Sequence, residues 1–229
     1  MYTVILPAAG TGSRMELGYN KLFYKIAGKS IIKHTVDHFL NDSKCKQIII
    51  VTSAADQAQM QALFPTKPQI EFVVGGANRQ ASVYAALAHV REDVVMIHDG
   101  ARPIVAPQQI DQCYQLARNG YGAVTAVKPK DTIKTAYFVN DNYFVNKTLN
   151  RDELILIQTP QAFPTNVLKT ANERAFSADS LDHATDDASL VELHTETDIV
   201  IVPGKYQNQK FTTPDDILYF EFLLTKGVL

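Results

Sequence analysis

Two glycines and two basic residues near the start of the chain have the types and spacing that bind a polyphosphate. Gly10 and Gly12 follow the apolar run 2–7, and Arg14 and Lys21 come after them. Glycine has no Cβ atom, so its backbone N–H groups can approach an anion closely, and the two cations add fixed positive charge. The segment predicts a strand that leads into a phosphate-binding loop, although a simple turn would use the same small residues.

This loop differs from two common glycine-rich signatures. A dinucleotide-binding fingerprint requires a third glycine at position 15, where the chain has Met15. A Walker loop requires Gly-Lys-Ser or Gly-Lys-Thr after four intervening residues, and that sequence is absent here. The loop therefore predicts phosphate binding of another kind.

Two polar clusters follow apolar runs further along the chain. In the first, Gly76 opens a loop, and Arg79 and Ser82 begin a predicted helix, which suits an anion and a hydroxyl group or only a capped turn. In the second, Asp99 and Arg102 stand three residues apart after a strand, at the edge where open α/β sheets bind ligands. Asp99 could hold a divalent cation through its oxygens, or it could simply pair with Arg102.

Two more clusters are less specific. Residues 130–134, with Arg151 and residues 158–161, flank a predicted hairpin, where charges are usually solvated. In residues 208–216, Thr213 and the following proline form a helix start, which leaves Lys210 as the residue that capping does not explain.

Composition limits the classes of partner. The 229 residues include 22 basic and 24 acidic side chains, and a formal net charge of −2 argues against a nucleic acid or an anionic membrane as the main partner. Cys45 and Cys113 are far apart and lack metal-ligand spacing, so neither a disulfide scaffold nor a zinc site is expected. The initial apolar run is too short for a signal peptide or a membrane span, so we expect a cytoplasmic protein.

Apolar, β-branched runs alternate with helical patterns along the chain. The predicted strands are 2–7, 47–52, 70–74, 94–97 and 123–127, and the predicted helices are 30–40, 54–64, 80–90 and 108–118. Continuous apolar strands separated by helices are typical of a mostly parallel sheet covered on both faces. We predict a doubly wound, Rossmann-like α/β fold and a single domain over residues 1–229.

One segment, at about 132–150, interrupts this alternation. Two aromatic and β-branched runs flank Asn140, Asp141 and Asn142, which is a hairpin pattern. So much apolar surface requires cover. The hairpin could fold back on its own domain, but we favour a projecting arm that pairs with a second subunit.

Taken in order, these motifs closely resemble those of the 2-C-methyl-D-erythritol 4-phosphate cytidylyltransferases, over nearly the whole chain. The matching segments are 6–15, Lys21, 75–76, Arg79, 82–83, 98–103, 131–134, 158–161, 185–186, 208–210 and 212–216. The resemblance implies a nucleotidyltransferase fold and a homodimer joined through the arm. It also implies a reaction of CTP with methylerythritol phosphate that requires Mg²⁺ and releases pyrophosphate, within the non-mevalonate isoprenoid pathway.

The resemblance also implies roles for individual residues. Those expected to bind CTP are Pro7, Ala8, Ala9, Gly10, Thr11, Gly12, Gly76, Ser82 and Asp99, with Asp99 also near the metal, and the catalytic cations are Arg14, Lys21 and Lys210. Those expected to bind the sugar phosphate are Arg79, Arg102, Thr132, Arg151, Thr159, Thr185 and Lys210. Asn20 and Glu16 stand where the family commonly has proline and glycine, so we expect the loop between them to be looser.

The chemistry of the reaction agrees with this set of residues. Nucleotidyl transfer needs positioning and neutralisation of the charge that grows on the α-phosphate, which Arg14, Lys21, Lys210 and Mg²⁺ would supply. The attacking group is already a phosphate anion. No general base is therefore required, and the sequence shows no nucleophile-and-base constellation.

Three other functions stay open at this stage. A ribitol-5-phosphate cytidylyltransferase shares the plan, although Ala8 and Ala9 in the loop and Gly100 before the Ala-Arg-Pro run favour methylerythritol phosphate as the acceptor. A dinucleotide-binding oxidoreductase lacks support because the third glycine is missing. A non-catalytic nucleotide-binding module would not need the retained cations.

Overall fold

The computed structural model describes residues 1–10, 18–178 and 184–227. Within this part, seven strands form one sheet in the order β11-β7-β10-β6-β1-β4-β5. The strands are β1 (Tyr2–Pro7), β4 (Cys45–Thr52), β5 (Ile70–Val74), β6 (Val94–Ile97), β7 (Gly122–Val127), β10 (Leu156–Pro164) and β11 (Ile199–Pro203). All neighbours are parallel except β10, which is antiparallel to both β6 and β7. The prediction of a mostly parallel sheet is confirmed.

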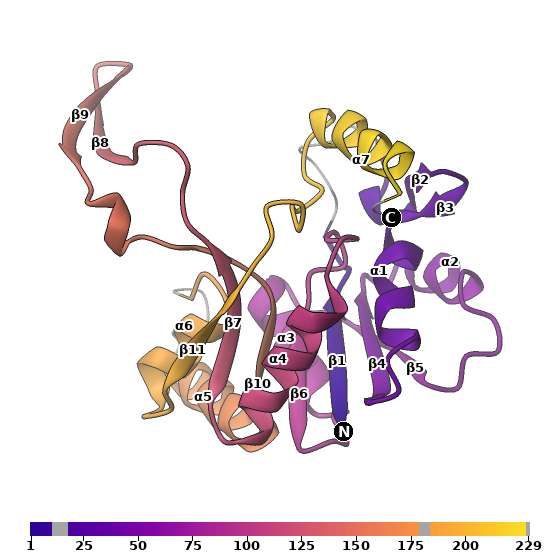
Figure 1. Cartoon of the computed structure of the whole chain (residues 1–229). Helices are drawn as coiled ribbons and strands as arrows, with labels where there is room; N and C mark the ends of the chain where they lie inside the picture. Colours follow the sequence, from indigo (N-terminus) through magenta and orange to yellow (C-terminus); the bar gives the residue numbers. More distant parts are fainter. Residues whose placement is uncertain (11–17, 179–183, 228–229) are drawn as a thin grey trace.

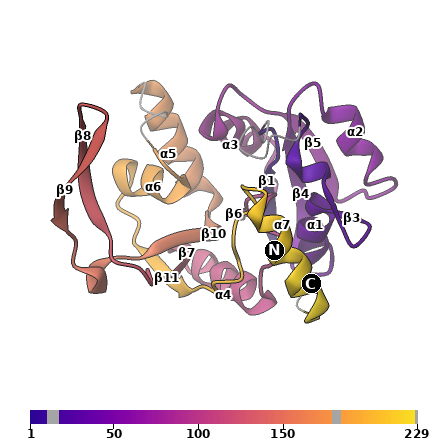
Figure 2. The ribbon, with the colours of Figure 1, turned by 90° about the horizontal axis from the view of Figure 1, so that it is seen from above.

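Helices cover both faces of this sheet. They are α1 (Ile31–Leu40), α2 (Gln57–Ala62), α3 (Arg79–Leu87), α4 (Pro107–Arg118), α5 (Thr165–Ser177), α6 (Asp187–His194) and α7 (Asp215–Thr225), with short 3-10 turns η2 (Lys21–Phe23) and η3 (Arg151–Glu153). Because side chains alternate along a strand, Val4 and Leu6 of β1 pack with α1 and α4, whereas Ile5 packs with α3, α5 and α6. Figure 2 shows these helix groups on opposite sides of the sheet, which confirms the doubly wound fold.

Two strands of the sheet, β10 and β11, and the helices α5 and α6 were not predicted. In β10, polar residues and a proline at 158–161 interrupt the apolar pattern. The helix start near Thr213 is confirmed. There the carboxylate of Asp216 accepts the backbone N–H groups of Thr212 and Thr213, at 2.6 and 2.7 Å, before α7 begins.

The predicted hairpin is an arm that projects from the sheet (Figure 1). It consists of β8 (Lys134–Val139) and β9 (Asn142–Thr148), paired with each other and with no other described strand. Asn140 and Asp141 join them with φ angles of +48° and +60°, the two-residue turn that suits the twist of a hairpin. Near the opposite end of the molecule, β2 (Lys25–Ile26) and β3 (Lys29–Ser30) form a second small hairpin.

The arm does not fold back on its own domain. Its six large apolar side chains are exposed, and the exposed fraction of Tyr143 reaches 80%. They are Tyr137, Phe138, Val139, Tyr143, Phe144 and Val145. The intramolecular alternative for the hairpin is therefore wrong. None of the helices in the described ranges combines the length and apolar character needed to cross a membrane.

Candidate active site

The carboxyl ends of β1 and β6, with the start of α3, surround a first hollow of about 440 Å³. Ten of the predicted site residues line it: Pro7, Ala8, Ala9, Gly10, Lys21, Gly76, Arg79, Ser82, Asp99 and Lys210. The tertiary structure thus brings residues 7–10 at the start of the glycine segment, the start of α3 and the segment before α7 to one place. Thr11, Gly12 and Arg14 lie outside the described residues.

The turn before α3 shows why the sequence has glycine there. A Cβ atom on Gly76 would lie 2.6 Å from the Cβ atom of Ala81, so a side chain does not fit. Asn78 caps α3 by accepting the backbone N–H of Ala81 at 2.8 Å, and the Ser82 hydroxyl donates to the Asn78 carbonyl at 2.7 Å. The capped turn is therefore present, and it forms one wall of the first hollow.

A second hollow of about 580 Å³ adjoins the first on the side of β10 and α6. The predicted residues Arg102, Thr159 and Thr185 line it, and three side chains line both hollows: Arg79, Asp99 and Lys210. The register of β10 shifts between Ile157 and Gln161, and such irregularities re-aim side chains at a strand edge. Two spaces therefore meet at one group of charged side chains.

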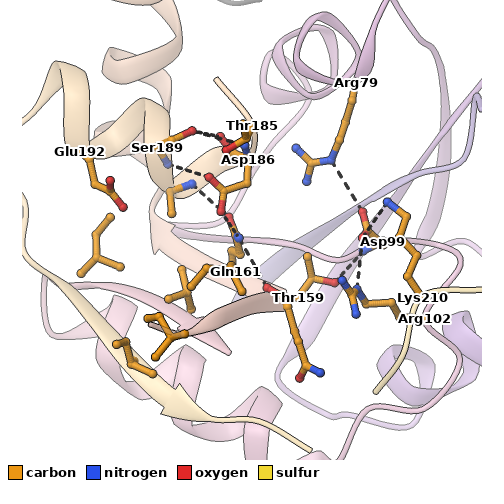
Figure 3. A pocket seen from close by; sticks show the side chains of 17 residues that line it. Arg79, Asp99, Arg102, Thr159, Gln161, Thr185, Asp186, Ser189, Glu192 and Lys210 are labelled. Carbon is orange, nitrogen blue, oxygen red and sulfur yellow. Dashed lines mark hydrogen bonds and ion pairs between the residues drawn. The ribbon is translucent and has the colours of Figure 1, made fainter. Parts of the chain in front are cut away.

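Asp99 is the centre of that group. Arg102 Nε and Lys210 Nζ lie 3.2 and 3.1 Å from its Oδ2 atom, and Arg79 Nε lies 3.7 Å from Oδ1. Figure 3 shows the three cations converging on this carboxylate. Burial alone would raise the pKa of Asp99, but Lys210, Arg79 and Arg102 together hold it well below its usual range. The Asp99–Arg102 ion pair considered from the sequence is thus real, and it is part of a larger cationic cluster.

A buried histidine holds the backbone around Asp99. His98 Nε2 lies 3.0 Å from the Arg102 carbonyl, so this nitrogen carries the proton and Nδ1 accepts from the Thr159 hydroxyl at 3.1 Å. The hydroxyl oxygen of Thr159 in turn accepts the Asp99 backbone N–H at 3.0 Å. Burial lowers the pKa of His98 to about 4, which keeps the ring neutral at pH 7.

Arg79 connects the cluster to α6 through a residue that the sequence analysis missed. Its Nη2 atom donates to Asp187 Oδ2 at 2.6 Å, and Asp187 is fully buried. Gln161 supports the same segment: its amide donates to Asp186 Oδ2 at 2.8 Å and its carbonyl accepts the Ala188 N–H at 3.0 Å. The Thr185-Asp186-Asp187 run was the available signal, but only Thr185 was selected from it.

Asn208 is a second missed residue. Arg102 Nη1 donates to the Asn208 carbonyl at 2.7 Å, and the Asn208 amide donates to the Thr159 carbonyl at 2.7 Å. Asn208 is fully buried two residues before Lys210. It therefore ties the segment that carries Lys210 to β10.

Two predicted residues stay apart from both hollows. Thr132 is exposed at the base of the arm, and Arg151 in η3 donates to the Lys130 carbonyl at 2.9 Å. Within one chain, the structure does not bring them to the cationic cluster. The expected looseness near Asn20 is also not seen at that residue, which is 4% exposed and hydrogen-bonded, while Glu16 lies outside the described residues.

The arrangement favours a ligand with several negative charges. Lys21, Arg79 and Lys210 line the first hollow, where Asp99 is the one carboxylate among the described lining residues, so the local charge there is positive although the whole chain is slightly acidic. The described residues contain no group of three or more His, Cys, Asp or Glu side chains that could hold a metal ion without other ligands.

Comparison with known proteins gives a consistent family. Residues 2–226 match the family model described as IspD: 2-C-methyl-D-erythritol 4-phosphate cytidylyltransferase. A protein of that name from Bacillus velezensis is 44% identical over 227 residues, which cover 97% of this chain and 95% of the relative.

Solved structures agree. The 4-diphosphocytidyl-2C-methyl-D-erythritol synthase of Anaerococcus prevotii superimposes with a TM-score of 0.84 at 28% identity, over 98% of this chain and 96% of the other. The Francisella tularensis 2-C-methyl-D-erythritol 4-phosphate cytidylyltransferase superimposes with a TM-score of 0.82 at 30% identity, over 96% of this chain and 98% of the other.

Proposed function

The chain belongs to the 2-C-methyl-D-erythritol 4-phosphate cytidylyltransferase family, and we propose that its first hollow binds CTP while its second hollow binds the sugar-alcohol phosphate. As a member of this family, it transfers the cytidylyl group of CTP to 2-C-methyl-D-erythritol 4-phosphate in isoprenoid precursor synthesis. The dinucleotide-binding oxidoreductase and the non-catalytic module are therefore wrong.

The assignment of CTP to the first hollow and of the sugar-alcohol phosphate to the second rests on one observation. Arg79, Asp99 and Lys210 line both hollows, so a phosphate from each side can reach the same cations. The first hollow is lined by Ala8, Ala9 and Gly10, the described start of the glycine segment, whose backbone N–H groups suit a triphosphate. The second is lined by Thr185, whose hydroxyl group suits a polyol, and by Thr159, whose hydroxyl group is already bonded to His98 and to the Asp99 backbone.

The proposed chemistry is a direct displacement at phosphorus. An oxygen of the acceptor phosphate forms a bond to the α-phosphorus of CTP, the bond from that phosphorus to the β-phosphate oxygen breaks, and pyrophosphate leaves. Lys21 and Lys210 would neutralise the charge that grows on the α-phosphate, together with Arg14. Because the attacking oxygen is already ionised, the residues of the site need only bind and orient the two phosphates.

Mg²⁺ fits this site only together with the triphosphate. Oδ2 of Asp99 is occupied by Arg102 and Lys210, whereas Oδ1 pairs, among the described residues, only with Arg79 Nε at 3.7 Å. Mg²⁺ commonly binds one or two carboxylates and completes its octahedron with substrate phosphates and water. We therefore propose that Asp99 would hold Mg²⁺ together with the triphosphate, and that the ion would polarise the phosphate oxygens of CTP.

We also propose a homodimer in which the arm completes the partner's second hollow. The exposed aromatic side chains of β8 and β9 supply an apolar surface for pairing. Thr132 and Arg151 at the base of the arm lie away from their own chain's cluster, so they are available to a second chain. A single domain over residues 1–229 and a cytoplasmic location remain part of the same proposal.

Pyrophosphate release tests the substrate assignment. The protein is assayed with CTP and Mg²⁺ and with either 2-C-methyl-D-erythritol 4-phosphate or ribitol 5-phosphate as acceptor. We expect kcat/KM to be at least about a hundredfold higher for methylerythritol phosphate, since polyol hydroxyls are read by fixed hydrogen bonds. A preference for ribitol 5-phosphate would overturn the assignment.

Mixing two inactive variants tests the shared site. Lys21→Ala removes a residue that each site takes from its own chain, and Arg151→Ala removes one that it would take from the partner. After random reassociation, half of the dimers contain one of each chain, and one of their two sites is intact, so about a quarter of the wild-type activity should return. No recovery on mixing would contradict the shared site.

A further inference from the structure

The side chain of Asn20 joins the two ends of the glycine-rich segment. Its amide nitrogen donates to the Ala8 carbonyl at 2.8 Å and to Asp56 Oδ2 at 3.0 Å. Its carbonyl oxygen accepts the Leu22 backbone N–H at 3.1 Å. Both N–H groups and the carbonyl of this 4% exposed side chain are therefore used.

The groups that Asn20 contacts are themselves fixed. Ala8 donates its backbone N–H to the Val51 carbonyl of β4 at 2.7 Å, and it is 1% exposed. Leu22 is 3% exposed and belongs to the core that includes α1. Asn20 thus connects the end of β1 to the start of η2 through anchors that belong to the rigid part of the fold.

Asp56 does not have the role that its position suggests. It occupies the N-cap position of α2, where an aspartate normally accepts a backbone N–H of the first turn, yet its side chain makes no such bond. One of its oxygens instead accepts from the Asn20 amide. The carboxylate is therefore aimed at Asn20 rather than at its own helix.

Lys21 lies between the two fixed positions. Asn20 and Leu22 are held on either side of it, so the backbone of Lys21 has little freedom, while its side chain lines the first hollow. A lysine side chain loses considerable conformational entropy when it is ordered on a phosphate. A fixed backbone reduces the further entropy that must be lost when the reacting groups are aligned.

We propose that Asn20 and Asp56 form a positioning pair that holds Lys21 at the first hollow and so acts on the cytidylyl transfer through that lysine. The inference rests on the proposed role of Lys21 in CTP binding. It adds two residues to the reaction that touch neither substrate. Their effect should appear mainly in kcat and should depend on Lys21 being present.

The test is a set of variants measured by pyrophosphate release and by thermal unfolding. Asn20→Ala should lower kcat about ten- to thirtyfold because it removes three hydrogen bonds, and Asp56→Ala should lower kcat about threefold because it removes one. Asp56→Asn retains an oxygen that can accept from Asn20, so its kcat should stay near the wild-type value. Asn172→Ala is the matched control: it removes a fully buried amide in α5 that lines neither hollow, and it should leave kcat unchanged.

The dependence on Lys21 separates positioning from simple damage to the fold. In a Lys21→Ala background, Asn20→Ala should cause less than about a twofold further loss of kcat. A further loss as large as that in the wild-type background, or an Asn20→Ala variant with more than half of the wild-type kcat, would overturn the proposal. Calorimetric binding of CTP to each variant separates a failure of the positioning pair from a wrong assignment of CTP to the first hollow. If CTP binds elsewhere, the Lys21→Ala variant binds CTP with the wild-type affinity.

Discussion

Acidification should destabilise the protein through His98. In the fold, His98 is neutral with a pKa of about 4, whereas an exposed histidine has an ordinary value of 6.5. Between these two pH values the unfolded chain binds more protons than the folded one, so the free energy of unfolding falls as the pH falls. The contribution is complete above about pH 6.5 and is lost as the pH approaches 4.

The size of the effect follows from this difference. One pH unit within the window is worth about 1.4 kcal/mol per group, so His98 should remove about 2 kcal/mol between pH 7 and pH 5 and about 3 kcal/mol by pH 4. Protonation of Nδ1 would also break the bond from the Thr159 hydroxyl, which holds the Asp99 backbone. Asp99 itself, whose pKa is lowered, contributes stability that is lost only below the ordinary carboxyl range.

Urea unfolding at pH 7, 6 and 5 measures this slope, with His98→Gln as the comparison. The glutamine variant should be less stable at pH 7, because it packs less well, but its stability should fall by about 2 kcal/mol less than that of the wild type on going to pH 5. The pKa of His34 is also lowered by burial, and its contribution is common to both proteins. If the free energy of unfolding fell by the same amount in the two proteins between pH 7 and pH 5, the pH dependence could not be assigned to His98.

Three further predictions concern the site and the arm. Lys21→Ala should lower kcat about a hundredfold with little change in Tm, because the lost cation acts on the transition state; turnover above about a third of the wild-type rate would count against it. Asp187→Ala removes the carboxylate that pairs with Arg79 at 2.6 Å, which should lower the free energy of unfolding by about 3–5 kcal/mol. Tm should then fall by about 6 °C or more in a calorimetric scan, and an unchanged Tm would show that the ion pair does not stabilise the fold. Replacing Phe138 and Phe144 together by Ser should weaken dimerisation in a sedimentation experiment, and a wild-type protein that is fully active as a monomer would exclude the proposed dimer.

The local parts of the site could be predicted from the sequence. Gly10, Gly76 and Asp99 each follow a strand that reads as a mostly apolar run, and the carboxyl ends of parallel strands meet at one edge of a sheet. The hairpin turn at Asn140 and Asp141 was predictable for a similar reason, since a two-residue turn depends on the conformations that these two residues accept. Such features depend on neighbours in the chain.

The contacts between distant segments could not be predicted. Arg79 and Asp187 are 108 residues apart, and only the tertiary fold, which brings the first residue of α3 to the first residue of α6, places the guanidinium at the carboxylate. A buried ion pair of this kind leaves no periodic pattern in the sequence. Each of its two residues looks, from its neighbours in the chain, like an ordinary residue at the start of a helix. The same holds for Asn20, which departs from the family pattern in sequence and becomes a connecting residue only when β1 and α2 surround it.

The sequence by itself determined the strand ends and the arm, and it predicted the glycine segment as a phosphate-binding site, because backbone preference and apolar periodicity act over a few residues. The tertiary structure decided which charges meet. It placed Arg79, Arg102 and Lys210 on one carboxylate and left Arg151 outside the cluster. Charge interactions depend on distance through space and on burial, and neither of these is set by spacing along the chain.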